Sequence, residues 1–282
     1  MFDPKVNKYP YPLYTDQHYI TVKKNNGLVF DKNYPYIDKS KKFLRKQKGI
    51  RFLLHLIVFP VTRIKLGLKI KNKKIIKENK ELLSKGAISV SNHVHFYDYL
   101  ALNLAIKPFK PYVLSWARNV TGESSKLVRL VGGIPIPEND FSATVAYLSQ
   151  VENHLKNGGW LQIYSEGSMW EYYAPIRPFK KGAAHLACCL NKPILPIGYS
   201  YRKANWIRRK IFHQPACFTL TIGEPLFPNM ELAKEEREID LTKRSHEAVC
   251  LLSGIDPKEN KYPPIFDKSK RVDYYTNQYG KK

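Results

Sequence analysis

The fold is decided at residues 92–98, which read Asn-His-Val-His-Phe-Tyr-Asp. An apolar run typical of a buried strand precedes them, and a stretch of helical composition follows. The carboxyl ends of strands in an α/β sheet open into a crevice, so polar residues at this junction are candidates for a site. A loop between strand and helix would let Asp98 reach one ring nitrogen of His93 while the other nitrogen faces a substrate. The spacing alone is weak evidence, because such pairs also arise by chance.

From residue 87 onward, short apolar runs alternate with helical stretches, which is the pattern of an α/β fold. We predict a central mixed sheet flanked by helices. The predicted strands are residues 87–91, 112–117, 160–165, 194–201 and 218–222, and the predicted helices are residues 96–106, 123–131, 141–156, 181–190 and 234–252.

The composition is that of a strongly basic globular protein. The 282 residues include 47 Lys or Arg against 24 acidic residues, which gives a net charge of +23. Such a charge indicates polyanionic partners, namely nucleic acid, anionic lipid or phosphorylated small molecules. No signal peptide is apparent and the four cysteines lack the spacing of a zinc site, so we expect reduced cysteines packed in the core.

A basic stretch from Lys39 to Lys80 contains fifteen Lys or Arg residues and one acidic residue, Glu78. Its apolar centre, residues 52–61, is too short to span a bilayer, because a transmembrane helix needs about 20 apolar residues. We predict that residues 39–82 form a basic amphipathic segment in a membrane interface, with its cations on anionic headgroups. A core-packing helix with a solvated basic flank is the alternative. The predicted membrane contacts are Arg51, Phe52, Leu53, Leu56, Phe59 and Arg63.

Both ends of the chain are rich in proline and tyrosine, as in residues 9–12, 33–36 and 262–264. Proline resists regular structure, and tyrosine suits a boundary between apolar and polar surroundings. We predict that residues 1–38 form a strap on the domain surface or at a lipid interface, and that residues 256–282 form a C-terminal tail.

Four further blocks follow the His-Asp pair. They are Gly-Gly-Ile-Pro-Ile at 132–136, Glu-Gly at 166–167, Phe-Lys-Lys-Gly-Ala at 179–183 and Pro-Ile-Leu-Pro-Ile at 193–197. Each block is weak evidence alone, but the ordered set is specific. The set resembles the glycerolipid acyltransferase family typified by the 1-acylglycerol-3-phosphate acyltransferases, over about residues 85 to 225.

The resemblance implies transfer of a fatty acyl group from acyl-CoA or acyl-carrier protein to a lysophospholipid hydroxyl, in phospholipid biosynthesis. A neutral His93 would take the proton of the attacking hydroxyl, and Asp98 would hold the tautomer of the ring. The substrate hydroxyl stands where a protease has its serine, so no acyl-enzyme is required. His95 is a rival base, but by the family pattern the histidine after Asn92 is the catalytic one.

The Glu-Gly block matches the family's acceptor-site motif. Cations are suited to holding a phosphomonoester, and Arg177, Lys180 and Lys181 are candidates. The alternative for Glu166 is a carboxylate that braces the turn, and the alternative for the cations is a solvated basic face. The predicted substrate contacts are Asn92, Glu166, Gly167, Ser168, Arg177 and Lys181.

Two positions depart from the family pattern. Met169 stands where the family has an arginine, and Pro137-Glu138 stands where a basic residue usually closes the Gly-Gly-Ile-Pro-Ile block. Both family residues are associated with gripping the acceptor's phosphate. An acceptor other than 1-acylglycerol-3-phosphate, such as another lysolipid or a glycolipid, therefore stays open, unless Arg118, Arg129 or Arg177 takes over.

Two other classes of function compete with acyl transfer. A non-catalytic basic protein that binds an anionic membrane or nucleic acid would explain the charge, but the densest basic run surrounds an aliphatic patch instead of the exposed aromatic residues of a nucleic-acid groove. A serine or cysteine hydrolase would need a nucleophile elbow, and the sequence has no G-x-S-x-G.

We expect residues 83–255 to form the acyltransferase domain. The thioester is a cosubstrate, so we expect no metal and no resident cofactor. The expected location is the cytoplasmic face of the cell membrane, as a peripheral or monotopic protein.

Overall fold

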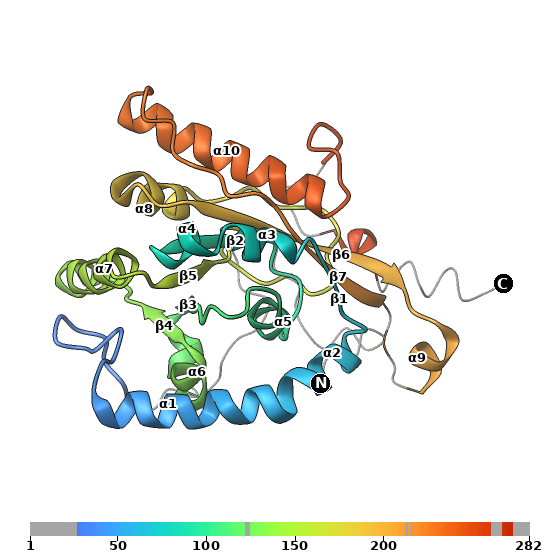
Figure 1. The fold of residues 1–282 in the computed structure, drawn as a ribbon, viewed down its shortest axis with the longest axis horizontal. Coiled ribbons are helices and arrows are strands. Elements are labelled where there is room, and N and C mark those ends of the chain that lie inside the picture. Colours follow the sequence, from blue (N-terminus) through green and yellow to red (C-terminus); the bar gives the residue numbers. More distant parts are fainter. Residues whose placement is uncertain (1–26, 122–124, 212–213, 215, 261–266, 273–282) are drawn as a thin grey trace.

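A seven-stranded sheet forms the centre of the computed structural model, which describes residues 27–121, 125–211, 214, 216–260 and 267–272 (Figure 1). The strands are β1 (Lys69–Lys71), β2 (Ala87–Ser91), β3 (Tyr112–Trp116), β4 (Gly133–Ile136), β5 (Trp160–Ile163), β6 (Ile194–Lys203) and β7 (Ala216–Ile222). Their order is β1-β7-β6-β2-β5-β3-β4. Neighbouring strands are parallel except β6 and β7, which pair antiparallel. The predicted fold class, a mixed sheet flanked by helices, is confirmed.

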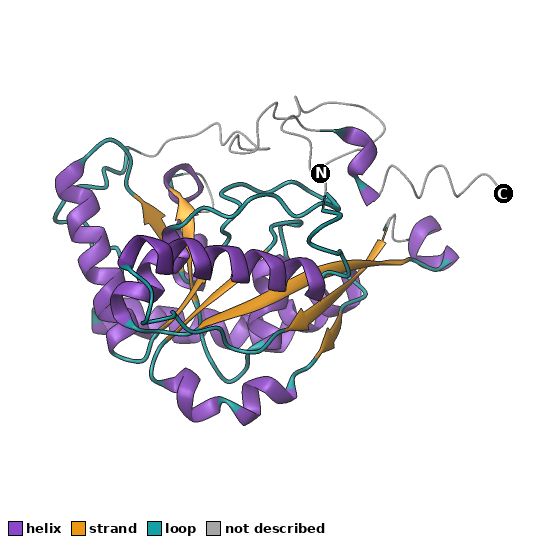
Figure 2. Ribbon diagram, turned by 90° about the horizontal axis from the view of Figure 1, so that it is seen from above, coloured by secondary structure: helices purple, strands orange, loops and turns teal. Residues whose placement is uncertain are grey.

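Helices lie on both sides of this sheet (Figure 2). One core packs β2 and β5 against α7, α8 and α10 around Val90 and Val151, and the other packs α3, α4 and α5 around Leu83 and Leu102. The helices are α1 (Lys41–Leu53), η1 (Leu54–Val58), α2 (Phe59–Lys65), α3 (Lys74–Glu78), α4 (Lys80–Ser84), α5 (Asp98–Ala105), η2 (Ala117–Val120), α6 (Ser125–Val131), α7 (Phe141–Lys156), α8 (Gly182–Leu190), α9 (Trp206–Lys210), α10 (Lys234–Leu252) and η3 (Lys268–Lys270).

The basic segment is shorter than predicted. Residues 41–65 are helical, but β1 then joins the sheet edge, and Ile75 and Ile76 are buried in the core. The boundary predicted at residue 82 is therefore too late, because these apolar residues belong to the body of the domain. Residues 41–65, called the interface segment below, run along one side of the molecule (Figure 1).

A π-helical turn, η1, interrupts the interface segment just before Pro60. Proline has no N–H, and its ring clashes with the carbonyl four residues earlier, so a regular α-helical turn is disfavoured there. The N–H of Phe59 instead bonds to the carbonyl of Leu54, five residues back. The segment thereby continues through the proline without a break.

The interface segment buries one face and exposes the other. Phe52, Leu53 and Leu56 are 49–66% exposed, and Arg63 is also exposed. Arg51 and Phe59 are only 8% and 2% exposed, because they pack against the body of the domain. The membrane contacts predicted for these two residues are thus corrected. Within the described part of the chain, every helix falls short of the length and apolarity that crossing a bilayer requires.

The described end of the N-terminal strap lies on the domain surface. Tyr36 is fully buried against Tyr147, and the backbone N–H of Ile37 donates to Gln150 Oε1 at 3.0 Å. Residues 9–12 and 262–264, on which the strap and tail predictions also rested, lie outside the described residues.

Candidate active site

His93 and Asp98 form the predicted pair at the carboxyl end of β2. Nδ1 of His93 lies 2.7 Å from Oδ2 of Asp98. A carboxylate can only accept, so Nδ1 carries the proton and the neutral ring keeps its lone pair on Nε2. The His93 side chain is 24% exposed and that of Asp98 is 2% exposed. The ring therefore has a buried, oriented side and an accessible side.

The turn between His93 and Asp98 holds the carboxylate in place. Oδ2 of Asp98 also accepts from the backbone N–H groups of Val94 and His95, at 3.2 and 3.4 Å. α5 begins at Asp98, two residues later than predicted, because residues 93–97 form this turn. The carboxylate thus reaches back from the first helical residue to the histidine.

Asn92, directly after β2, forms hydrogen bonds to β6 beside the His93–Asp98 pair. Its side-chain amide donates to the carbonyl of Tyr199 at 3.0 Å and accepts from the Tyr199 N–H at 2.8 Å. Asn92 is 1% exposed. This geometry gives Asn92 a positioning role in place of the predicted substrate contact.

Tyr164, the first residue after β5, contacts both His93 and Asp98. It was not predicted from the sequence as a site residue. Its ring stacks on the imidazole of His93, with centroids 3.8 Å apart and planes 13° apart. Its hydroxyl donates to Oδ1 of Asp98 at 2.7 Å. Burial, and then the charge of Asp98, raise the pKa of Tyr164 well above its ordinary value, so the hydroxyl stays a donor. The sequence signal for this residue is its place at a strand end, two residues before Glu166.

We expect Tyr164→Phe to move the acid limb of the pH profile of kcat/KM to higher pH while retaining substantial activity. The variant keeps the stacked ring but removes the bond to Asp98, so the carboxylate holds the imidazolium more strongly. A pH series of initial rates measures the shift. Tyr164→Leu, which removes the stack as well, should lose far more activity. An unmoved acid limb in Tyr164→Phe would refute the positioning role.

Glu166 and Arg177 form a buried ion pair under the site. Oε2 of Glu166 accepts from Nη2 of Arg177 at 2.7 Å and from the backbone N–H of His93 at 2.9 Å. Arg177 also donates to Ser168 Oγ at 2.7 Å and lies over the ring of Trp170. Glu166, Ser168 and Arg177 are at most 3% exposed. The bracing alternative fits these contacts, and a substrate contact by these three side chains does not.

Lys180 is an exposed cation beside the Glu-Gly turn. Gly167 has φ of +83°, and a Cβ there would lie 2.8 Å from Cε of Lys180. Lys180 and Gly167 are both exposed. Lys181 lines a different hollow, together with Phe179 and α10. The structure therefore brings Lys180 to the site edge, while the substrate contact of Lys181 stays a prediction without support from this placement.

His95 is a buried neighbour of the site. It is 7% exposed, and its Nδ1 accepts from the Tyr97 N–H at 3.1 Å, so the neutral ring carries its proton on Nε2. Burial lowers the pKa of His95 to about 4. A neutral, enclosed imidazole suits the role of a neighbour better than that of the rival base.

The lowered pKa of His95 predicts that the folded protein loses stability in acid. Below its ordinary pKa of 6.5 the unfolded chain binds a proton at His95, whereas the folded protein does so only near pH 4. The free energy of unfolding should therefore fall as the pH drops from about 6.5 to about 4, by roughly 3 kcal/mol from this residue. Urea unfolding across this range measures the slope, and His95→Gln should flatten it. An equal slope in both proteins would contradict the assignment.

The interface segment ends beside the site. Lys65, its last helical residue, places Nζ 3.3 Å from the hydroxyl of Tyr97 and 4.6 Å from the ring centroid. Tyr97 directly precedes Asp98. The end of the segment that exposes Phe52, Leu53 and Leu56 therefore contacts the turn between His93 and Asp98.

One cluster of metal-binding residue types occurs among the described residues. His185 and Cys189, one turn apart on α8, face Glu238 on α10, and their ligand atoms lie within 4.8 Å of one another. The sequence spacing did not predict this cluster, because one member comes from a distant helix. Cys188, Cys217 and Cys250 are buried, as expected, but Cys189 is exposed on α8, so the prediction of a core position is wrong for that residue.

Comparisons with known proteins identify a family and solved structures that resemble this chain. The family model described as Acyltransferase matches residues 68–200. The crystal structure of the 1-acyl-sn-glycerophosphate (LPA) acyltransferase PlsC from Thermotoga maritima is 15% identical over 77% of this chain and 84% of that chain, with a TM-score of 0.46. No curated protein matches the chain significantly.

Proposed function

The chain belongs to the acyltransferase family through residues 68–200, and on this premise we propose that it moves a fatty acyl group from a thioester donor to a lysophospholipid hydroxyl. Acyl-CoA and acyl-carrier protein are the candidate donors. The observation that carries the proposal is the His93–Asp98 pair, in which an oriented imidazole keeps Nε2 available on its accessible side. The proposed setting is the cytoplasmic surface of an anionic membrane, in phospholipid biosynthesis.

In the proposed reaction, Nε2 of His93 takes the proton of the acceptor hydroxyl as its oxygen attacks the thioester carbonyl. Asp98 stabilises the imidazolium that forms. The tetrahedral intermediate then expels the thiolate, which takes the proton back from His93. The products are an ester and a free thiol, and the enzyme returns to its starting protonation state without an acyl-enzyme.

Lys180 is the residue that we propose for the acceptor's phosphate. Arg177 is engaged by Glu166 and Ser168, whereas Lys180 is exposed beside Gly167. A flexible ammonium suits a phosphomonoester that approaches from solvent. An acceptor without a phosphomonoester, such as a glycolipid, is the second candidate, because Met169 stands at the position of the family's arginine.

The test is a panel of lysolipids offered to the purified protein with labelled acyl-CoA and, in parallel, labelled acyl-carrier protein. Formation of the diacyl product from a lysophospholipid supports the proposal, and the preferred headgroup decides between the two acceptor candidates. A Lys180→Gln variant should raise KM for a phosphomonoester acceptor more than for a glycolipid. No acyl transfer to any lysolipid would refute the proposed substrate class.

We expect the triple variant Phe52→Gln, Leu56→Gln, Ile57→Gln to lose membrane association. These residues are 55–66% exposed on the outer face of the interface segment, and burying each in lipid contributes on the order of 1 kcal/mol or more. Vesicle partitioning should fall by more than about tenfold.

The matched control for this triple variant replaces three apolar residues of similar exposure on α7 and α10. These are Val145, Ile239 and Leu251, which are 51–64% exposed. If their replacement by glutamine lowers partitioning equally, the interface segment has no special role. Point substitutions are preferable to deleting residues 51–69, because the deletion would also remove the buried Arg51 and Phe59.

A further inference from the structure

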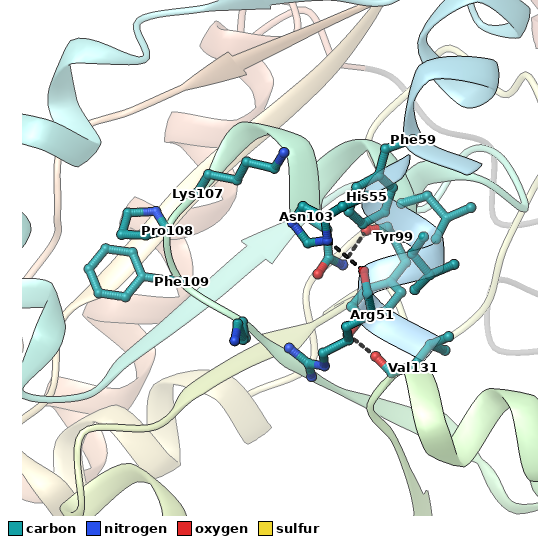
Figure 3. Close-up of a pocket in the computed structure, with 12 residues that line it drawn as sticks. Arg51, His55, Phe59, Tyr99, Asn103, Lys107, Pro108, Phe109 and Val131 are labelled. Atoms are coloured by element: carbon teal, nitrogen blue, oxygen red, sulfur yellow. Dashed lines mark hydrogen bonds between the residues drawn. The ribbon is translucent and has the colours of Figure 1, made fainter. Parts of the chain in front are cut away.

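A cavity lies on the inner side of the interface segment, away from His93. It has a volume of about 270 Å³ and lies between α1, η1 and the loop at residues 107–110 that follows α5 (Figure 3). His93 precedes the first residue of α5, whereas this loop follows the last one. Tyr99, Leu100 and Asn103 of α5 also line the cavity, whereas His93 and Asp98 do not, so the cavity extends along α5 but is separate from the catalytic pair.

Arg51 supplies a buried positive charge to the cavity wall. It is 8% exposed, and its Nη2 has only a long contact, 3.5 Å, with the carbonyl of Pro111. Its Nε has no hydrogen-bond partner among the described residues. A buried cation without a counter-ion is costly, and none of the described residues that line the cavity carries a carboxylate. An anion in the cavity would remove this cost.

Two lysines bring further positive charge to the same space. Lys107 and Lys110 are exposed at the mouth, and Lys107 extends across it, with Nζ 5.7 Å from the ring of Phe59 (Figure 3). Nδ1 of His55 lies 2.7 Å from the carbonyl of Arg51 and must donate to it. The donor of His55 is therefore already used, and the positive charge of the site comes from Arg51 and the two lysines. The charged groups thus surround the mouth and one wall.

The remaining walls are apolar. Leu54, Phe59, Leu100, Phe109 and Val131 line them. The volume is near the lower limit of small-molecule sites, which suits a headgroup without its acyl chains. The outer face of the same helical segment exposes Leu53, Leu56 and Ile57, along which such chains could lie.

We propose that this cavity binds the phosphate of an anionic membrane phospholipid, as a site separate from the His93 site. The inference rests on the proposed function for the membrane setting, and it adds a defined headgroup site to a general basic surface. Arg51, Lys107 and Lys110 hold the phosphate, and the apolar walls receive the glycerol backbone. The shared chemistry, a phosphate near an apolar wall, could also come from a soluble phosphate ester, so the test separates the two sources.

The test measures binding to vesicles of phosphatidylcholine with and without phosphatidylglycerol. The cavity variant is Arg51→Gln, Lys107→Gln, Lys110→Gln. Its matched control, Lys42→Gln, Lys46→Gln, Lys48→Gln, removes the same charge from exposed positions on α1. We expect the cavity variant to weaken binding to phosphatidylglycerol vesicles about tenfold more than the control does, because it loses charge-assisted hydrogen bonds as well as general attraction.

Equal losses in the two variants would overturn the proposal, since general electrostatics would explain both. The double variant Lys107→Gln, Lys110→Gln leaves the buried Arg51 intact and should still bind more weakly than Lys46→Gln, Lys48→Gln, so the test does not depend on the folding of the triple variant. If glycerol 3-phosphate without vesicles raises Tm of the wild type but not of the cavity variant, the site takes a soluble ester and the lipid assignment is overturned. The readout is binding, so it is independent of whether any lysolipid is acylated.

Discussion

His93→Ala is expected to lower kcat/KM for acyl transfer by about 10³–10⁴-fold while leaving the protein folded. The imidazole is the one proposed acceptor for the hydroxyl proton, and general-base catalysis contributes effects of about 10²–10⁴. The side chain is partly exposed, so its loss should change stability little. Initial rates with the acceptor selected by the lysolipid panel measure the loss.

Two comparisons make this prediction specific. Asp98→Asn should cost about as much, because a neutral amide does not stabilise the imidazolium and its NH2 group would face a donor where the carboxylate accepts hydrogen bonds on both oxygens. His185→Ala removes an exposed histidine on α8 and should leave the rate unchanged. If His93→Ala keeps more than about a tenth of the activity, the general-base role is wrong. A stable acylated protein after incubation with the donor alone would refute direct transfer.

Arg177→Met is expected to lower the free energy of unfolding by about 3–5 kcal/mol. The substitution leaves the carboxylate of Glu166 buried without its counter-ion, and Oε2 of Glu166 is also the acceptor for the His93 N–H. Activity should fall with stability, because the turn that carries His93 loses its brace. Urea unfolding measures the first effect, and initial rates measure the second.

The control for this prediction is the surface ion pair between Asp240 and Arg244, whose side chains are about one third exposed. Arg244→Met should cost less than about 1 kcal/mol, because exposed ion pairs contribute little. Adding Glu166→Gln to Arg177→Met should recover part of the loss, since no unpaired charge then remains. If Arg177→Met instead raises KM for the acceptor without destabilising the protein, Arg177 binds the phosphate and the bracing role is wrong.

The regular elements with strong patterns were predictable from the sequence. Residues 141–156 and 234–252 form helices with the predicted limits, and β2 has the predicted limits as well. β1 and β4 were missed as strands, since three or four residues carry too little periodicity to distinguish a strand from a loop. β4 also contains Pro135, and a proline inside a short run argues against predicting a strand there.

The site was predictable only where its members are close in sequence or match the family motifs. The His93–Asp98 contact follows from a strand-to-helix junction, which local sequence reveals. The burial of Arg177 against Glu166 depends on how the loop after β5 folds back, and the stacking of Tyr164 on His93 depends on the neighbouring positions of β2 and β5. Arg51 was predicted on the exposed face of the interface segment, but it packs against the body of the domain. The hydrophobicity pattern of the segment does not show that a basic residue packs inward.

The π-helical turn before Pro60 sets the rotational phase of the interface segment. The buried positions run from Gln47 through Arg51 and Phe59 to Leu66. Over this distance an unbroken α-helix, turning about 100° per residue, would drift about 100° away from the body. The wider turn absorbs most of this drift, so the cavity-lining surface and the exposed apolar surface keep their separate sides along the whole segment. The turn thus accommodates one residue more than a regular α-helix of the same phase, so a one-residue deletion within Leu54–Val58 should leave Phe59 facing the body, whereas a regular α-helix of unchanged length would turn it outward.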